Sequence, residues 1–214
     1  MTAMSKFAIL LGGTVKTTKR LTKQLKDSRV IAADSGMQHA DPLNLKAELW
    51  VGDFDSASTS LQKKHVDVPR QTYDAEKDAT DGEIAIAEAL RRGATSLILV
   101  GGFGGQFDHT LAHAGFLLGL AKRGMDIFMT SGNEEAHALI DELEIDDLSV
   151  GTRLSIAPVA DLRGLTLTGV KWPLHKRDVP LGSALTLSNI VEGTVRMNML
   201  SGLALVITYP LESE

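Results

Sequence analysis

The first 130 residues of the chain alternate short apolar runs with segments of helical periodicity. The apolar runs predict buried strands at residues 7–11, 30–33, 48–51, 96–100 and 126–129. The periodic segments predict helices at residues 17–27, 80–92 and 108–123. This alternation of strand and helix is typical of an α/β domain with a mostly parallel sheet and helices on its faces.

After about residue 133 the pattern changes to short runs rich in Val, Ile, Leu and Thr. These runs predict strands at residues 153–160, 165–170, 184–191, 194–200 and 203–209, separated by glycines. Because no long helical period appears, we expect a small all-β sandwich domain. The sequence therefore predicts an α/β domain over residues 1–133 and a β-sandwich over residues 134–214.

Composition narrows the possible functions. A chain of 214 residues with 43% hydrophobic and 23% charged residues is an ordinary globular protein. Its net charge of −5 argues against nucleic acid or an anionic membrane as the main partner. The absence of cysteine excludes thiolate catalysis and Cys-ligated zinc. The apolar run at residues 7–11 is too short for a signal peptide or membrane span, so we expect a soluble cytoplasmic protein.

Six aspartates follow predicted strands or begin predicted helices of the first domain. They are Asp34, Asp53, Asp55, Asp78, Asp81 and Asp108. In a parallel sheet the turns that follow the strands lie on one edge, where ligands bind. We therefore expect these carboxylates to gather in one region.

The segment Asp53-Phe54-Asp55 is the sharpest signal among them. In an extended backbone both carboxylates would face the same side while Phe54 turns toward the core. Two close carboxylates repel, and a hard divalent cation such as Mg²⁺ removes that conflict. The alternative is a local turn in which Asp hydrogen-bonds the backbone. The other aspartates expected at this edge favour the metal.

Two further features suggest a phosphate ligand. The run Gly101–Gly105 lies between a predicted strand and a predicted helix, where backbone N–H groups and the helix terminus favour an anion. Gly12-Gly13-Thr14 is a weaker copy of the same signal. Asp78 and Asp81 would also be favoured by a helix N-terminus alone. Lys77 is either a solvated charge or a phosphate contact.

The sequence lacks the motifs of three other kinds of active site. The glycine run lacks the Gly-Lys-Ser/Thr of a Walker A loop, and the chain has no Gly-x-Ser-x-Gly nucleophile motif. His109 and His113 have the spacing of a zinc-binding helix, but Thr110 stands where the catalytic Glu would follow. We interpret His113 as a surface or packing residue.

Five stretches, in order along the chain, resemble the thiamine pyrophosphokinase family. They are Ala33–Gly36, Gly52–Ser56, Glu76–Asp81, Gly101–His109, and Gly169–Leu174 with Leu187–Asn189. The resemblance implies a homodimer with an ATP-binding α/β catalytic domain and a β-sandwich domain for thiamine binding and dimerisation. Its reaction would transfer the pyrophosphoryl group of ATP to the hydroxyl of thiamine, giving thiamine diphosphate and AMP.

The resemblance also implies roles for individual residues. Mg²⁺ would be held by Asp53, Asp55 and Asp81, with Asp34, Asp78 and Asp108 around the triphosphate and the reacting hydroxyl. The ATP phosphates would lie against Lys77, Gly101, Gly102, Gly104, Gly105 and Gln106. The thiamine side would be shaped by Trp172, Thr186, Ser188 and Asn189.

One departure from the family pattern leaves other functions open. The family commonly has Arg at the position of Gln106, and a neutral amide is a weaker phosphate contact than a guanidinium. The change either weakens phosphate binding or is compensated by a nearby Lys. The alternatives are a non-catalytic nucleotide-binding sensor and an ATP-dependent pyrophosphokinase for another small alcohol.

Overall fold

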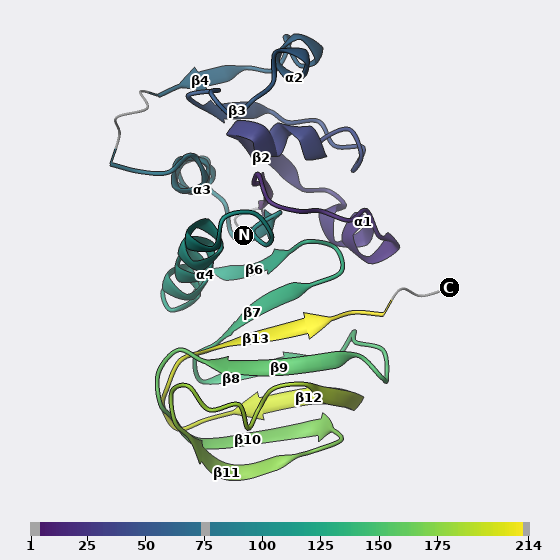
Figure 1. Ribbon diagram of the computed structural model, residues 1–214, viewed down its shortest axis with the longest axis vertical. Coiled ribbons are helices and arrows are strands. Elements are labelled where there is room, and N and C mark those ends of the chain that lie inside the picture. The colour runs from purple at the N-terminus through teal and green to yellow at the C-terminus, as the bar shows by residue number, and fades with distance from the viewer. Residues whose placement is uncertain (1–4, 74–77, 212–214) are drawn as a thin grey trace. The chain divides into compact units, whose positions relative to one another are not determined.

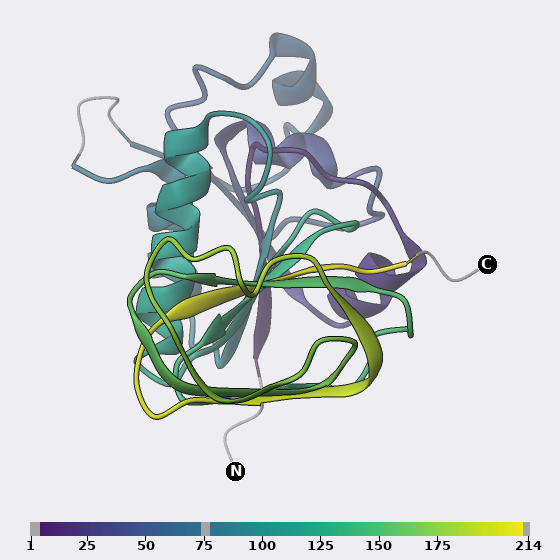
Figure 2. The same cartoon turned by 60° about the horizontal axis from the view of Figure 1, so that its bottom comes forward.

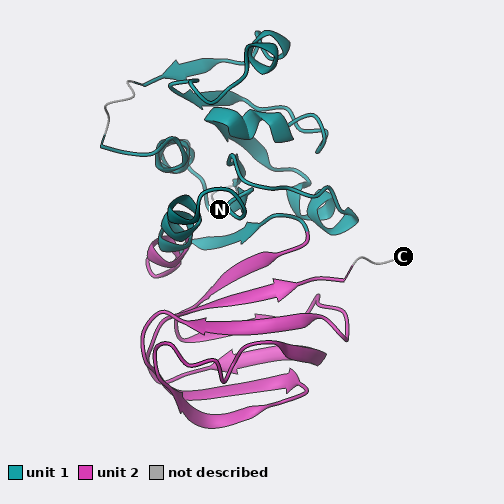
Figure 3. Ribbon diagram, viewed as in Figure 1, with its two compact units in different colours: residues 1–116, 125–132 teal, residues 117–124, 133–214 magenta. Residues whose placement is uncertain are grey.

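The computed structural model describes residues 5–73 and 78–211. The chain divides into two compact units, coloured separately in Figure 3. Unit 1 comprises residues 1–116 and 125–132, and unit 2 comprises residues 117–124 and 133–214. No helix within the described ranges is long and apolar enough to cross a membrane.

Unit 1 is built on a parallel sheet with the strand order β6-β5-β1-β2-β3-β4. Every described pairing within this sheet is parallel, which confirms the α/β fold expected from the sequence. The strands are β1 (Lys6–Leu10), β2 (Arg29–Ala33), β3 (Leu49–Gly52), β4 (Arg70–Thr72), β5 (Ser96–Val100) and β6 (Asp126–Thr130).

Helices cover both faces of this sheet, with α3 and α4 on one side and α1 on the other (Figure 1). The helices are α1 (Lys19–Leu25), α2 (Thr59–Lys64), α3 (Asp81–Arg91) and α4 (Phe107–Ala121), with the 3-10 helix η1 (Asp34–His39). Thr80 is the N-cap of α3, and its hydroxyl accepts a hydrogen bond from the N–H of Glu83 at 3.2 Å. This is the cap that the Thr80–Glu83 spacing indicates.

Sequence analysis missed α2 and β4. Helix α2 has six residues, none of them buried, and β4 consists of three exposed residues, Arg70-Gln71-Thr72. Neither element carries the apolar periodicity that sequence patterns depend on, because β4 is an edge strand and α2 lies against the surface.

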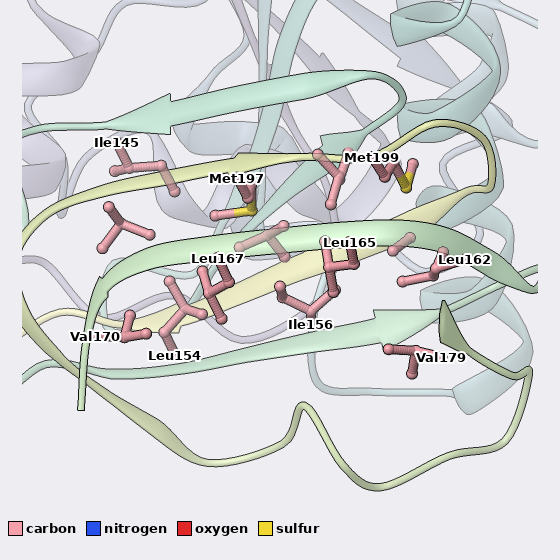
Figure 4. Packing of buried hydrophobic residues seen from close by; sticks show 14 of the residues in the cluster. Ile145, Leu154, Ile156, Leu162, Leu165, Leu167, Val170, Val179, Met197 and Met199 are labelled. Carbon is pink, nitrogen blue, oxygen red and sulfur yellow. The ribbon is translucent and has the colours of Figure 1, made fainter. Parts of the chain in front are cut away.

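Unit 2 is a two-layered β-sandwich, and its strands are visible as two layers in Figure 2. The strands are β7 (Glu135–Leu139), β8 (Glu142–Ile145), β9 (Arg153–Pro158), β10 (Leu162–Val170), β11 (Leu174–Val179), β12 (Asn189–Asn198) and β13 (Ala204–Tyr209). All described pairings are antiparallel. The core between the layers consists of aliphatic side chains such as Ile156, Leu165 and Met197 (Figure 4).

Strand β12 corrects one expectation. The sequence predicted separate strands at residues 184–191 and 194–200, but residues 184–188 form a turn and β12 runs without interruption through Gly193. Asn189 and Ile190 pair with β9 in one layer, whereas Val195 to Asn198 pair with β8 and β10 in the other. Val191 already pairs with Val170 of β10, so the strand changes layers between Ile190 and Val191, ahead of Gly193. The sequence pattern also missed β7, β8 and β11.

A network of ion pairs joins the C-terminal end of α3 to residues at the start of β2 and just before β3. The carboxylate of Glu88, which is 6% exposed, binds Arg91 at 2.7 Å and Arg92 at 2.6 Å. Arg92 also binds Glu48 at 2.7 Å, and Glu48 binds Arg29 at 2.7 Å. The hydrogen bond from Arg91, followed by that from Arg92, lowers the pKa of Glu88 from 4.5 to about 2.

We expect Glu88→Gln to lower the free energy of unfolding by about 2 kcal/mol at pH 7, because the variant loses charge-assisted hydrogen bonds. The folded-state pKa of Glu88 is depressed, so its stabilisation is present above pH 4.5 and is lost as the pH falls toward 2. Thermal melts at pH 7 and pH 3 should therefore show a difference between parent and variant that shrinks in acid. Glu83→Gln, an exposed change on the same helix, is the control, and an equal loss in both variants would contradict the assignment.

Candidate active site

A cavity of about 430 Å³ lies at the carboxyl edge of the unit 1 sheet. Its walls are the turns that follow β1, β2, β3 and β5, together with the first residues of α3 and the first turns of α4. Eight of the residues predicted from the sequence line it: Asp34, Asp55, Asp81, Gly101, Gly102, Gly104, Gly105 and Gln106. The parallel topology has thus brought segments far apart in the chain to one place.

Two glycine loops form one wall of the cavity, packed backbone to backbone. The N–H of Gly13 donates to the carbonyl of Gly101 at 2.9 Å, and the N–H of Thr14 donates to that of Phe103 at 2.8 Å. A Cβ on Gly13 would lie 2.2 Å from the Phe103 carbonyl oxygen. The first loop therefore supports the second, and its N–H groups at positions 13 and 14 are already used.

Asp34, Asp53 and Asp55, which we call the acidic trio, come together at this edge. Each offers one carboxylate oxygen, and these oxygens lie within 4.8 Å of one another. Gly52 permits the close approach, because a Cβ there would lie 3.2 Å from the Cβ of Asp34. The sequence prediction grouped Asp53 and Asp55 with Asp81. In the structure Asp34 completes the group, and Asp81 lines the cavity from the first turn of α3.

Asp34 is an unusual carboxylate. It is only 9% exposed, and its Oδ1 has no hydrogen-bond partner within the described part of the chain. Burial raises the pKa of Asp34, an effect that the N–H of Ser35 opposes and that the charges of Asp81, Asp53 and Asp55 reinforce. A buried oxygen without a partner among like charges is stabilised by a bound cation, and three carboxylates are the hard oxygen ligands that Mg²⁺ prefers.

The turn that carries Asp53 and Asp55 differs from the extended segment that we expected. Phe54 has a left-handed φ of 65°, and the Asp53 carboxylate accepts a hydrogen bond from the N–H of Asp55 at 3.1 Å. The local turn proposed as the alternative is therefore present, and the two carboxylates still gather with Asp34. Phe54 does turn toward the core, where its ring packs edge-to-face on Trp50 with centroids 5.0 Å apart.

The remaining polar candidates of unit 1 lie outside the cavity or at its rim. Asp78 and Asp108 are exposed and do not line the cavity, and the Asp108 carboxylate accepts from the N–H of His109 at 2.8 Å. Gln106 is an exposed lining residue. Lys77 lies outside the described residues.

His113 has a packing role, as the sequence suggested, but it also lines the cavity. It is buried, and its Nδ1 lies 3.3 Å from the carbonyl oxygen of Gly102. Burial lowers the pKa of His113, which favours a neutral ring that can donate to this carbonyl. Sequence reasoning did not connect His113 with the glycine loop, because no local pattern places a helix side chain beside a turn.

In unit 2 the four residues predicted for the thiamine side divide into two classes. Thr186 and Asn189 are buried, and Thr186 donates to the Ile156 carbonyl at 2.6 Å. Asn189 accepts from the N–H of Trp172 at 3.1 Å and donates to its carbonyl at 2.8 Å. Trp172 is 55% exposed, and Ser188 is exposed with a left-handed φ of 59°. Thr186 and Asn189 thus support the backbone, whereas Trp172 exposes an aromatic ring with the Nζ of Lys171 5.0 Å from its centroid.

Comparison with protein families gives matches over both units. The family model "Thiamin pyrophosphokinase, catalytic domain" matches residues 21–129, and the model "Thiamin pyrophosphokinase, vitamin B1 binding domain" matches residues 142–203. The thiamine pyrophosphokinase of Bacillus subtilis (strain 168) is 31% identical over 143 residues. That alignment covers 64% of this chain and 66% of the relative, just under two thirds of its length.

Solved structures show the same fold. The thiamine pyrophosphokinase of Bacillus subtilis superposes with a TM-score of 0.84 at 25% identity, covering 96% of this chain and 99% of that one. The thiamin pyrophosphokinase of Geobacillus thermodenitrificans gives 0.78 at 25% identity, covering 98% and 99% of the two chains. Yeast thiamin pyrophosphokinase shares the fold. It superposes with a TM-score of 0.74 at 14% identity, covering 97% of this chain and 87% of that one.

Proposed function

The chain belongs to the thiamine pyrophosphokinase family, and we propose that it transfers the pyrophosphoryl group of ATP to the hydroxyl of thiamine. An enzyme of this family is a transferase. The observation that supports the proposal best is a cavity lined both by a glycine loop at a helix start and by Asp34 and Asp55, two members of the acidic trio. Phosphate chains and divalent cations are the ligands that such a combination fits.

The triphosphate of ATP lies, in this proposal, against the loop Gly101–Gly105 and the first turn of α4. The loop backbone reaches the cavity without side chains, and the helix terminus favours negative charge. Gln106, directly before α4, and Asp81, the first residue of α3, flank this position. The polar groups at this position would bind and orient the phosphates. Positioning of the reactants is most of what phosphoryl transfer requires of a protein.

The acidic trio would hold Mg²⁺, with Asp81 close by, because the unpartnered Oδ1 of Asp34 and the facing carboxylates fit a hard cation. A cation held by these carboxylates would offset the negative charge on the phosphate oxygens. The thiamine hydroxyl oxygen forms a bond to the β-phosphorus, and the bond from that phosphorus to the α-bridging oxygen breaks, releasing AMP. The hydroxyl proton passes to a carboxylate. Of the carboxylates that the resemblance places around the reacting hydroxyl, Asp34 lines the cavity, whereas Asp78 and Asp108 do not.

Thiamine recognition falls to unit 2, where Trp172 offers an exposed ring to an aromatic, cationic substrate. Aromatic faces attract organic cations. The hydrogen bonds from Asn189 fix the backbone on either side of that ring. We also propose that the chain is a homodimer, because a small sheet alone buries little surface. Light scattering should give the mass of a dimer at micromolar protein.

The decisive test measures AMP release with ATP, Mg²⁺ and thiamine, with thiamine omitted as the control. We expect AMP and thiamine diphosphate in equal amounts. A pyrophosphokinase for another alcohol would ignore thiamine, and a sensor would bind ATP without turnover. Either result would contradict the proposal, and calorimetric titration with ATP would then distinguish them.

Gln106 provides a more specific prediction. If this exposed cavity residue contacts phosphate, Gln106→Arg adds a charge-assisted hydrogen bond, which is roughly twice as strong as a neutral one. We expect the KM for ATP to fall about fivefold, as roughly 1 kcal/mol of added binding implies. Steady-state kinetics measures this, with Gln71→Arg on the edge strand β4 as the matched control. A KM equal to or above that of the parent would contradict the placement of Gln106.

A further inference from the structure

One buried side chain touches both turns that carry the acidic trio. Trp50 on β3 is 0% exposed, and its indole Nε1 donates to the backbone carbonyl of Asp34 at 2.8 Å. The indole ring also packs edge-to-face against the ring of Phe54, with the two ring centroids 5.0 Å apart. Trp50 therefore contacts the turn after β2 through a hydrogen bond and the turn after β3 through an aromatic pair.

Two of the residues that Trp50 contacts, Asp34 and Phe54, have backbone conformations that L-residues avoid. Asp34 has a φ of 42° and Phe54 a φ of 65°. A left-handed conformation costs a non-glycine residue about 1 kcal/mol or more, and it persists only where the surroundings hold it. The hydrogen bond to Asp34 and the ring contact with Phe54 are such surroundings, and both come from one side chain.

A second group of contacts holds the Asp53–Ala57 loop from its outer side. The amide Nε2 of Gln62 on α2 donates to the carbonyls of Phe54 at 3.3 Å and Ala57 at 2.9 Å. The guanidinium of Arg70 on β4 lies over the rings of Trp50 and Phe54, at 4.8 Å and 5.5 Å from their centroids. Arg70 also donates to the carbonyl of Gln62 at 2.6 Å. The two elements that sequence patterns missed thus clamp the turn that carries Asp53 and Asp55.

We propose that Trp50 is a positioning residue that sets the spacing of the acidic trio, and that Gln62 secures the same turn from α2. Trp50 touches no substrate, and it acts through the carbonyl of Asp34 and the ring of Phe54. Replacing Trp50 should weaken the binding of a divalent cation, and it should leave the rate of the chemical step at saturating cation largely unchanged. This inference rests on the proposed role of the trio as the Mg²⁺ site.

The test is Trp50→Phe, which keeps an aromatic side chain but deletes the indole N–H. We expect the free Mg²⁺ concentration for half-maximal AMP release to rise at least fivefold, with the rate at saturating Mg²⁺ restored to within threefold of the parent. Binding of Mn²⁺ alone, followed by electron paramagnetic resonance, should weaken by a similar factor. The control is Phe7→Leu, a fully buried change in β1 of the same unit, which should lower the Tm but leave both metal constants within twofold.

Gln62→Met keeps the proposal falsifiable if Trp50→Phe does not fold, because Gln62 is only half-buried. It should raise the same two metal constants about threefold. Unchanged constants in the variants that fold would overturn the positioning role and leave the proposed function intact. A parent protein that neither binds Mn²⁺ nor requires a divalent cation would instead overturn the metal role of the trio, and the inference with it.

Discussion

Replacing either outer carboxylate of the acidic trio, Asp53→Asn or Asp55→Asn, should lower the rate of AMP release at least a hundredfold. Each change keeps the shape of the side chain and removes a negative oxygen from a group whose oxygens lie within 4.8 Å. A neutral amide is a poor ligand for Mg²⁺, and loss of the cation leaves the phosphate charge uncompensated. The fold should survive, because Asn at position 53 can still accept the hydrogen bond from the N–H of residue 55.

The measurement is AMP release at saturating ATP and thiamine, with circular dichroism and thermal melts to establish folding. Asp67→Asn serves as the matched control, since Asp67 is an exposed carboxylate outside the cavity. The control should retain the activity of the parent. Full activity in both Asp53→Asn and Asp55→Asn would remove the trio from the reaction.

The second large effect is expected from Gly13→Ala, a change of a single methyl group. The new Cβ would lie 2.2 Å from the carbonyl oxygen of Phe103 and 2.4 Å from that of Gly101. Both are backbone atoms, so the two glycine loops must separate and the hydrogen bonds from positions 13 and 14 must lengthen or break. We expect a loss of roughly 2–3 kcal/mol in stability, typical of overpacking, and at least a tenfold rise in the KM for ATP.

A Gly→Ala substitution at another position should raise the stability of the protein instead of lowering it. Gly115 lies within α4, and a Cβ there would meet nothing within 4 Å. Gly115→Ala should therefore stabilise the protein by about 0.5–1 kcal/mol, since alanine is the better helix former. Thermal and urea melts of the two variants give the comparison. A Gly13→Ala protein as stable and active as the parent would show that the loops tolerate separation.

The elements that could be predicted from the sequence are those whose burial follows from local pattern. Strand β5, residues 96–100, is buried at every position and was predicted with its observed bounds. Strand β4 and helix α2 could not be found this way, because neither has a buried residue and both are held by tertiary contacts such as those of Arg70 and Gln62. A short element on the surface produces no periodic pattern of hydrophobic residues in the sequence.

The candidate site shows the same division. The rule that parallel strands end at one edge was enough to predict that Asp34, Asp55 and Asp81 would lie together, and they line one cavity. Which three oxygens approach one another could not be predicted, because the approach of Asp34 depends on the left-handed turns at positions 34 and 54 and on the absence of a Cβ at Gly52. The roles proposed for these residues are tested by the variants above.

The two tryptophans of the chain lie in different units and in opposite environments. Trp50 is 0% exposed in unit 1, and Trp172 is 55% exposed in unit 2. Their fluorescence should therefore separate, with blue-shifted emission from Trp50 and red-shifted, readily quenched emission from Trp172. With one of them replaced by phenylalanine, the other becomes an optical reporter of its own unit. Denaturant titrations read at the two reporters will show whether the units melt together or in sequence.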